Sequence, residues 1–332
     1  MRHGLNELLA AVSRSFYLTI RVLPPPVRDP VALAYLLART SDTVADSAGA
    51  SPAVRLELLR QMGEAVHGRE PVPDFTALLP LVPDAAERRL LEQAGALWAL
   101  LEATPPEDRE EIAWVLEEIL RGQQLDLTRF GQGATGEIRA LATAQELEDY
   151  TYSVAGCVGE FWTRVCHRHL SDYAPGVGLE ELSRLGASFG KGLQLVNILR
   201  DAPADLANGR CYFPVEELGR IDPGALRTTP ELARPACDRW MARARAHLDD
   251  GLRYSEAVRP WRLRLACFLP WALGVRTLAL LEINRPLETA RRVKVPRREV
   301  RRFLFLGGLA ACGATGLRLA AARVQKAFPH RD

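Results

Sequence analysis

A polar stripe on an otherwise apolar helix is the feature that most limits how this chain can fold. In the stretch QLVNILRDAPAD, polar residues recur at intervals of three, four and four: Gln194, Asn197, Asp201 and Asp205. At 3.6 residues per turn, these side chains share one face of a helix. Leucine, valine and isoleucine flank that face. The spacing therefore predicts a helix that presents two carboxylates and two amides in an apolar setting.

A second stretch, AYLLARTSDTVAD, repeats the pattern. Its polar residues recur at intervals of four, three and four: Tyr35, Arg39, Asp42 and Asp46. Acidic residues number 41 among 332, so a single DxxxD is weak information, whereas two copies on apolar helices are stronger. We expect the two pairs of carboxylates to face each other across a cavity, where they would repel each other without cations. Oxygen ligands of this kind suit Mg²⁺, which commonly keeps positions for water and substrate phosphate.

The whole chain indicates an all-α fold. No segment alternates polar and apolar residues over a sustained length, and helical patterns follow one another. We expect helices at 4–20, 31–47, 54–67, 87–103, 108–122, 136–170, 178–202, 231–257 and 262–283. They would surround a central hydrophobic cavity in one domain, 1–295, followed by a basic and apolar tail, 296–332. A net charge of +2 gives no signal for nucleic acid.

The stretch LEDYTYSVAGCVGEFW combines small residues with tyrosines. A glycine inside a helix costs about 1 kcal/mol relative to alanine, so Gly156 and Gly159 indicate close approach of a helix or of a ligand. Taken alone, the stretch favours tight helix packing, with Tyr150 at its rim. A role for Tyr150 in chemistry stays open on these residues.

Cysteine usage favours the cytoplasm. The six cysteines show no CxxC pairing, and several lie in apolar runs, so we expect reduced, packed thiols. The first ten residues lack the long apolar region of a signal peptide.

With these stretches placed, the chain resembles the squalene/phytoene synthase family of head-to-head prenyl transferases. The matching motifs, which span about residues 8–300, are SRSF (13–16), DTVAD (42–46), YxxxVAGxVG (150–159), LQLVNILRDxxxDxxxGRxYFP (193–214) and CFLP (267–270). The first aspartate motif, CFLP and the run VKVPR (293–297) are most similar to the squalene synthase branch.

The resemblance implies an isoprenoid-synthase fold, Mg²⁺ and two farnesyl diphosphates joined through presqualene diphosphate to squalene with NADPH. Any NADPH would bind in the same cavity rather than on a separate domain. The implied Mg²⁺ ligands are Asp42, Asp46, Asn197, Asp201 and Asp205. The implied contacts to diphosphate, or residues that frame its site, are Arg14, Ser15, Phe16, Tyr35, Arg39, Gln194, Arg200 and Arg210. Tyr150 is the implied proton-transfer residue, and Lys294 and Arg297 are the implied NADPH contacts.

Two departures from the family pattern matter. Ala45 and Ala204 stand where the squalene branch often has a further acidic residue. Pro203 lacks an N–H and disfavours helical geometry before it, so we expect the helix to kink or end there. Asp205→Asn should then be less damaging than Asp201→Asn.

Other functions remain open on the sequence. A phytoene or dehydrosqualene synthase, or a presqualene diphosphate synthase without the reductive step, would share these motifs. A non-enzymatic, membrane-associated helical scaffold is the alternative from another class. Residues 303–317 carry no charge and follow several arginines, which favours peripheral contact with the inner face of a membrane over a span that needs about 20 residues. Packing of this last helix on the domain is the other interpretation.

Overall fold

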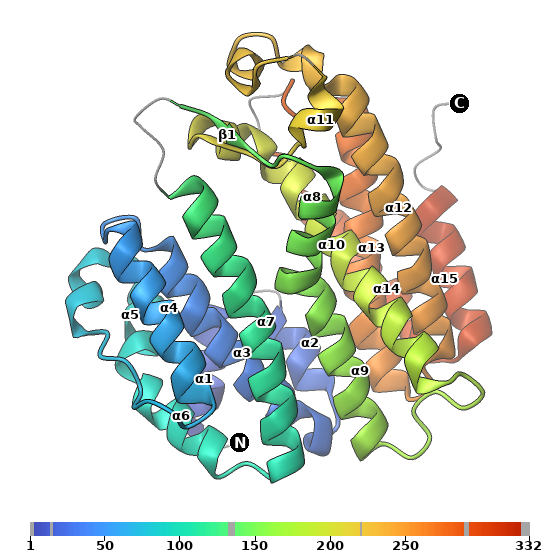
Figure 1. Cartoon of the computed structure of the whole chain (residues 1–332). Coiled ribbons are helices and arrows are strands. Elements are labelled where there is room, and N and C mark those ends of the chain that lie inside the picture. Colours follow the sequence, from blue (N-terminus) through green and yellow to red (C-terminus); the bar gives the residue numbers. More distant parts are fainter. Residues whose placement is uncertain (1–2, 14–15, 132–136, 220, 289–291, 327–332) are drawn as a thin grey trace. The chain divides into compact units, whose positions relative to one another are not determined.

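A computed structural model describes residues 3–13, 16–131, 137–219, 221–288 and 292–326 (Figure 1). The chain divides into two compact units, the first made of Met1–Gln132 with Arg164–His169 and the second of Gly133–Thr163 with Leu170–Asp332. Helices form nearly all of the regular structure in the described residues, so the all-α prediction is confirmed. The single domain over 1–295 stays a prediction.

Unit 1 is built from short and long helices that precede residue 132. Its elements are α1 (His3–Val12), α2 (Phe16–Val22), α3 (Pro25–Asp46), α4 (Pro52–Val66), the 3-10 helix η1 (Thr76–Leu81), α5 (Ala85–Glu92), α6 (Ala94–Glu102) and α7 (Pro106–Phe130). Helix α3 packs against α4, α6 and α7. It begins earlier than the pattern predicted because prolines are tolerated in a first helical turn. The predicted helix 87–103 is divided into α5 and α6 at Gln93.

Helix α3 buries the apolar side chains that the sequence placed around the first aspartate pair. Val31, Leu33, Leu36 and Leu37 are each at most 5% exposed. Fully burying a leucine or valine side chain contributes roughly 1.5–3 kcal/mol. The orientation of α3 within unit 1 is therefore set by this apolar face, and the stripe that carries Asp42 is fixed with it.

Unit 2 holds the remaining elements. They are β1 (Arg139–Ala140), α8 (Ala144–Thr151), the π-helix η2 (Tyr152–Gly156), α9 (Cys157–His169, whose last six residues belong to unit 1), α10 (Leu179–Ala207), β2 (Arg210–Cys211), α11 (Val215–Leu218), the 3-10 helices η3 (Pro223–Arg227) and η4 (Pro230–Ala233), α12 (Arg234–Ala257), α13 (Trp261–Asn284), α14 (Arg297–Ala311) and α15 (Ala314–Lys326). The predicted helix over 136–170 is wrong at its start, where β1 pairs in parallel with β2.

Helix α10 continues through Pro203 and ends at Ala207. Of the two expectations, an end of the helix at this proline is wrong, and a kink there stays a prediction. One missing N–H is a local loss, and the apolar face of α10, with Val196, Ile198 and Leu199 buried, keeps the helix packed against α12 and α13. Asp201 and Asp205 consequently stay one turn apart on one continuous helix.

Glycines bring α10 very close to the segment that contains η2 and α9. A Cβ on Gly159 would lie 2.0 Å from the Gly186 oxygen, and one on Gly190 would lie 2.2 Å from the Ala155 oxygen. Side chains cannot fit at these points, which explains why glycine is required. Close helix approach, the interpretation favoured by this stretch alone, is confirmed. The π-helical turn here is informative because such turns occur often at functional sites.

The C-terminal segment forms two helices that pack on α12 and α13. The uncharged run 303–317 is interrupted at Gly313, whose φ of 133° lies in a region that favours glycine. Phe303, Leu306 and Leu317 are buried, so both helices contribute to the core. Arg276 and Glu299 form an ion pair between α13 and α14.

One described helix, α13, is long and apolar enough to cross a membrane. This rests on length and composition alone, and 56% of its most apolar window is buried within the protein. Its contacts with α10, α12, α14 and α15 are those of a core helix.

No disulfide joins the six cysteines, all of which lie in the described part of the chain, and five of them are buried. Burial raises the pKa of Cys267 to about 12, which keeps this thiol protonated. Cys312 is exposed, so the prediction of a packed thiol is wrong there, because it lies at the end of α14 where the chain turns.

Candidate active site

Asp42 lies in a partly buried position on α3. Its Oδ1 accepts a hydrogen bond of 2.7 Å from the Gln123 side chain of α7, and its Oδ2 lies 3.6 Å from Arg39. The pKa of Asp42 is raised to about 6: desolvation is the main cause and the nearby Asp46 acts in the same direction, while Arg39 and Gln123 oppose them. Because 46% of the side chain still contacts solvent, the free-energy cost of ionising it is smaller than the pKa shift alone implies.

The other residues of this stripe are a cation, a phenol and a second carboxylate. Arg39 pairs closely with Glu87 of α5 as well as with Asp42. The Tyr35 hydroxyl lies 3.5 Å from the Val12 carbonyl oxygen, a weak hydrogen bond, and desolvation raises the pKa of Tyr35. Asp46, one turn beyond Asp42, is exposed. Unit 1 therefore places a carboxyl with a raised pKa and an exposed carboxyl on the same helix face.

Asp201 on α10 has the opposite surroundings. Both of its oxygens accept hydrogen bonds from Arg200, at 3.0 and 2.6 Å, and from Arg292, at 2.7 and 2.9 Å. Desolvation acts to raise the pKa of Asp201, but the two guanidinium groups outweigh it and hold the pKa below its usual range. This carboxylate is therefore ionised throughout the neutral range.

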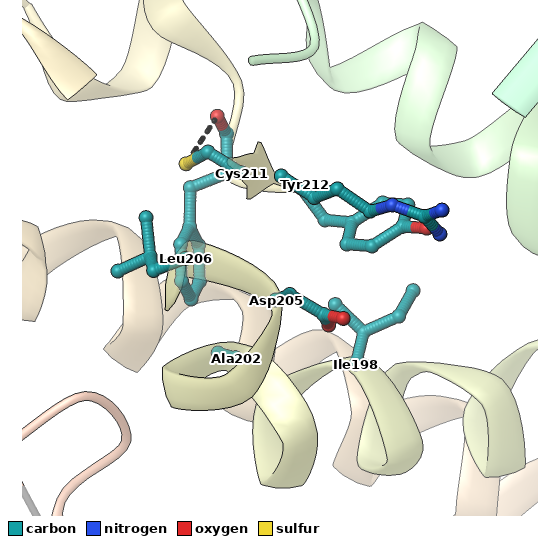
Figure 2. Close-up of a pocket in the computed structure, with 8 residues that line it drawn as sticks. Ile198, Ala202, Asp205, Leu206, Cys211 and Tyr212 are labelled. Atoms are coloured by element: carbon teal, nitrogen blue, oxygen red, sulfur yellow. Dashed lines mark hydrogen bonds between the residues drawn. The ribbon is translucent and has the colours of Figure 1, made fainter. Parts of the chain in front are cut away.

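Asp205 lines a small pocket at the end of α10. Ile198, Ala202 and Leu206 form its helical wall, and residues Arg210–Phe213 form the opposite side. Figure 2 shows the Asp205 carboxylate and the Tyr212 ring on the same side of this pocket, away from Leu206. The pocket volume of about 10 Å³ is close to the minimum for one water molecule. Asp205 thus has a cationic side chain, Arg210, and a phenol, Tyr212, within the same small enclosure.

The two amides of the stripe lie upstream on the same helix. The Asn197 side chain donates to the Gln194 side chain at 3.5 Å, so they lie side by side one turn before Asp201. Both side chains are half-buried.

Tyr150 is at the end of α8, immediately before the π-helical turn η2. Its ring stacks on Tyr212 at a centroid distance of 5.1 Å, and the two hydroxyls are 3.4 Å apart. Tyr212 also lines the pocket that contains Asp205. Unit 2 therefore brings Tyr150, Tyr212, Arg210 and Asp205 together.

Some predicted site residues lie elsewhere. Arg14 and Ser15 are outside the described residues, and Phe16 begins α2, with its side chain also outside the description. Lys294 and Arg297 are exposed, on the segment that leads into α14.

Several contacting residues were missed by sequence reasoning. Gln123 and Glu87 bind α3 residues from other helices, and Arg292 binds Asp201 from 91 residues away. Nothing in a local pattern identifies such partners. Tyr212 is different, because it lies inside the GRxYFP motif and its aromatic ring could have been considered.

The donor set fits Mg²⁺, which prefers oxygen ligands. Each stripe offers two carboxylates, and α10 adds the amide of Asn197. Asp42 beside Asp46, with a raised pKa, is a position where a cation would remove like-charge repulsion. Within the residues that the structure describes, no group of three Asp, Glu, His or Cys side chains forms a ready-made metal site. The stripes therefore suit a metal that also takes ligands from water and substrate.

Comparison with known protein families shows the family of this chain. Residues 9–299 match the family described as squalene/phytoene synthase. The chain belongs to the squalene/phytoene synthase family. This match extends over most of the chain and includes both aspartate motifs, so the resemblance carried by the motifs is confirmed.

Two squalene synthases are similar in sequence to this chain. The chain is 28% identical to squalene synthase ERG9 of Saccharomyces cerevisiae over 283 residues, covering 84% of this chain and 61% of the yeast protein. It is 30% identical to the squalene synthase of Yarrowia lipolytica over 298 residues, again covering 84% and 61%. The chain thus spans about three fifths of the length of these relatives.

A solved structure has a similar fold. TcSQS in its complex with the ligand E5700 superposes with a TM-score of 0.77 at 23% identity, covering 99% of this chain and 92% of that one. The isoprenoid-synthase type of helical fold predicted for this chain is confirmed.

Proposed function

We propose that the protein is a squalene synthase-like, Mg²⁺-dependent prenyl transferase that condenses two farnesyl diphosphates. The observation that carries the proposal is the pair of DxxxD stripes, each on a helix with a buried apolar face, in a chain that belongs to this family. Two such stripes within one family match are stronger support than one, and carboxylates of perturbed pKa are typical of functional sites.

The aspartate pairs are proposed to hold the metal. Asp42 and Asp46 would bind Mg²⁺ on α3, and Asp201, Asp205 and Asn197 would bind Mg²⁺ on α10. When bound, Mg²⁺ supplies electrostatic stabilisation of the negative charge that develops on departing diphosphate.

The remaining polar residues of the stripes are proposed to bind and orient diphosphate. Arg210 lies beside Asp205, and Arg200 beside Asp201, so each can donate to phosphate oxygens next to a carboxylate. Arg39 and Tyr35 would act in the same way from α3, with Gln194 beside Asn197. Arg14, Ser15 and Phe16 are assigned to this group by their match to the SRSF motif.

Tyr150 is proposed as the proton-transfer residue of the first half-reaction. Its hydroxyl lies within reach of the Tyr212 hydroxyl, and Tyr212 faces the pocket of Asp205, so a proton on Tyr150 has a polar route toward bound diphosphate. The apolar faces of α3 and α10 would exclude water, which would otherwise consume an allylic cation.

The reductive half is proposed from the basic segment that carries Lys294 and Arg297. Lys294 and Arg297 offer exposed cations on one segment, which suits the phosphates of NADPH. One G-x-G-x-x-G occurs, at 131–136, but it follows helix α7 rather than a β-strand, so it lacks the context of a dinucleotide-binding turn. A phytoene or dehydrosqualene synthase, or a presqualene diphosphate synthase, would share all other features.

The test is product analysis. Purified protein is incubated with farnesyl diphosphate and Mg²⁺, with and without NADPH, and the lipid products and released diphosphate are identified. We expect presqualene diphosphate without NADPH and squalene with it. Dehydrosqualene, or presqualene diphosphate under both conditions, would favour the non-reductive alternatives. No release of diphosphate from any prenyl diphosphate would favour a scaffold.

We also propose that the protein contacts the inner, cytoplasmic face of a membrane peripherally, through α14. Phe305 is 82% exposed and Leu304 46% exposed, directly after the exposed Arg301 and Arg302. Cations followed by an exposed aromatic side chain suit an anionic bilayer surface. Deleting 303–332 would remove buried core residues, so Phe305→Glu is the sharper test.

The membrane proposal predicts a change in vesicle binding. Phe305→Glu should reduce co-sedimentation with anionic vesicles several-fold, while Val54→Glu, at an exposed apolar position on α4, should not. Equal binding of both variants would contradict the proposal.

A further inference from the structure

Arg292 makes a contact that the family motifs do not explain. It lies in the non-helical segment 292–296 that precedes α14, and its guanidinium forms a two-point hydrogen bond with Asp201. The Nε atom is 2.7 Å from Oδ1 and the Nη2 atom is 2.9 Å from Oδ2. Arg200 makes the same two-point contact from within α10. Each oxygen of Asp201 therefore accepts two hydrogen bonds from cations.

This arrangement saturates the carboxylate. A carboxylate offers about four lone-pair sites, and four guanidinium hydrogen bonds use them all. A divalent cation that binds Asp201 directly needs at least one of these sites, so one arginine must release the carboxylate. Metal and arginine consequently compete for the same oxygens.

The two arginines differ in how easily they can move. Arg200 is the helical neighbour of Asp201, and its side chain is 26% exposed. The side chain of Arg292 is 57% exposed and comes from a segment without helical hydrogen bonds. Moving Arg292 therefore breaks one exposed ion pair and leaves α10 unchanged.

We propose that Arg292 is a counter-ion latch: it covers Asp201 in the metal-free protein, releases it to the incoming cation, and then pairs with the diphosphate that the cation carries. The inference rests on the proposed function, because it takes Asp201 as a metal ligand. A planar guanidinium that fits a carboxylate at two points fits a phosphate in the same way. The latch keeps the charge at Asp201 balanced at every stage.

The latch predicts opposite effects on metal and on substrate. Without Arg292, a cation meets less competition at Asp201 and binds more tightly, by about two- to fivefold, the range expected of an exposed ion pair. Diphosphate loses a charge-assisted partner, so KM for farnesyl diphosphate should rise about tenfold. A residue that only stabilises the fold would not produce this pair of opposite changes.

The experiment compares wild type, Arg292→Ala, Arg292→Lys and Arg323→Ala. Arg323 is an exposed arginine on α15, so its removal is a matched change in net charge. Mn²⁺ affinity is measured by electron paramagnetic resonance without substrate, and KM is measured separately with Mg²⁺. We expect Arg292→Ala to tighten Mn²⁺ binding and to raise KM. Arg292→Lys keeps the positive charge but cannot make the two-point hydrogen bond of a guanidinium, so its Mn²⁺ affinity and its KM should lie between those of Arg292→Ala and wild type.

The result that overturns the latch is a Mn²⁺ affinity in Arg292→Ala equal to, or weaker than, that of Arg323→Ala. The Mn²⁺ measurement needs no turnover, so it decides the latch even if wild type releases no diphosphate, an outcome that would count against the proposed function alone. An unchanged KM with tighter Mn²⁺ binding would overturn the transfer of Arg292 to diphosphate.

Discussion

The two aspartate stripes have the same spacing but opposite electrostatic surroundings. On α3, desolvation and a second carboxylate raise the pKa of Asp42 to about 6. On α10, two guanidinium groups outweigh desolvation and lower the pKa of Asp201. A motif of two aspartates one turn apart therefore fixes geometry but not ionisation. The neighbours contributed by other parts of the chain decide whether the metal-free carboxylate carries a charge.

The largest effect should come from removing the first carboxylate of either stripe. Asp42→Asn and Asp201→Asn should each reduce diphosphate release by about 100- to 1000-fold, since each removes a charge that holds metal against the leaving group. Steady-state assays at limiting Mg²⁺ measure this. If either variant keeps near wild-type turnover, its stripe does not bind the metal.

Asp205→Asn tests whether both carboxylates of α10 bind the metal. Because α10 does not end at Pro203, Asp201 and Asp205 lie on one helix, and we expect a loss in Asp205→Asn comparable to that in Asp201→Asn. The same assay of both variants at saturating and at limiting Mg²⁺ measures this. Retention of activity by Asp205→Asn alone would show that the continuous helix does not bring both carboxylates to the metal.

Gln123→Leu should lower activity in a way that depends on pH. The hydrogen bond from Gln123 lowers the pKa of Asp42, so its loss should raise that pKa further. Asp42 must lose its proton to bind metal, so activity should fall about tenfold at pH 6–7 and recover toward pH 8.5. Gln61→Leu, on the surface of α4, is the control. A loss that is equal at every pH would indicate damage to the fold instead.

The smallest effect concerns stability without metal, where the two stripes should respond with opposite signs. Asp42 has a folded-state pKa above its unfolded value. Its contribution to stability is therefore fully present below the unfolded pKa and is lost as the pH rises to about 6. Asp201 has a lowered pKa, so its contribution is present above the unfolded pKa and is lost as pH falls. At pH 8, Asp42→Asn should raise Tm by about 2 °C, and Asp201→Asn should lower it by about as much.

Thermal unfolding in chelator at pH 8 and pH 5 checks these signs. At pH 5 the gain from Asp42→Asn should fall to about half, because the folded-state carboxyl is then largely protonated while the unfolded-state carboxyl is still largely ionised. A shift of the same sign in both variants at pH 8 would contradict the contrast between the stripes.

The sequence predicted the geometry of each stripe because helical periodicity is local. Four residues in register with buried leucines are enough to place Asp42 and Asp201 on helix faces. Ionisation could not be predicted, because Gln123 and Arg292 lie 81 and 91 residues from their partners. All but three of the 43 basic residues are arginine, so no pattern singles out the ones that pair.

The wrong expectation at Pro203 has a related cause. A local rule, the missing N–H of proline, was outweighed by packing along 29 residues of α10. The glycine contacts were predicted correctly for Gly156 and Gly159, where small residues follow one another. Their partners Gly186 and Gly190 lie on another helix and could be recognised only from the structure.

Proton release on metal binding tests the central claim, that both stripes bind Mg²⁺ from different starting charges. Calorimetric titration with Mg²⁺ at pH 6, in buffers of different ionisation enthalpy, counts the protons. With a pKa of about 6, Asp42 should release roughly half a proton per molecule as the cation binds. We predict this release in wild type, its loss in Asp42→Asn, and its persistence in Asp201→Asn at weaker affinity. Equal release in wild type and Asp42→Asn would contradict the account.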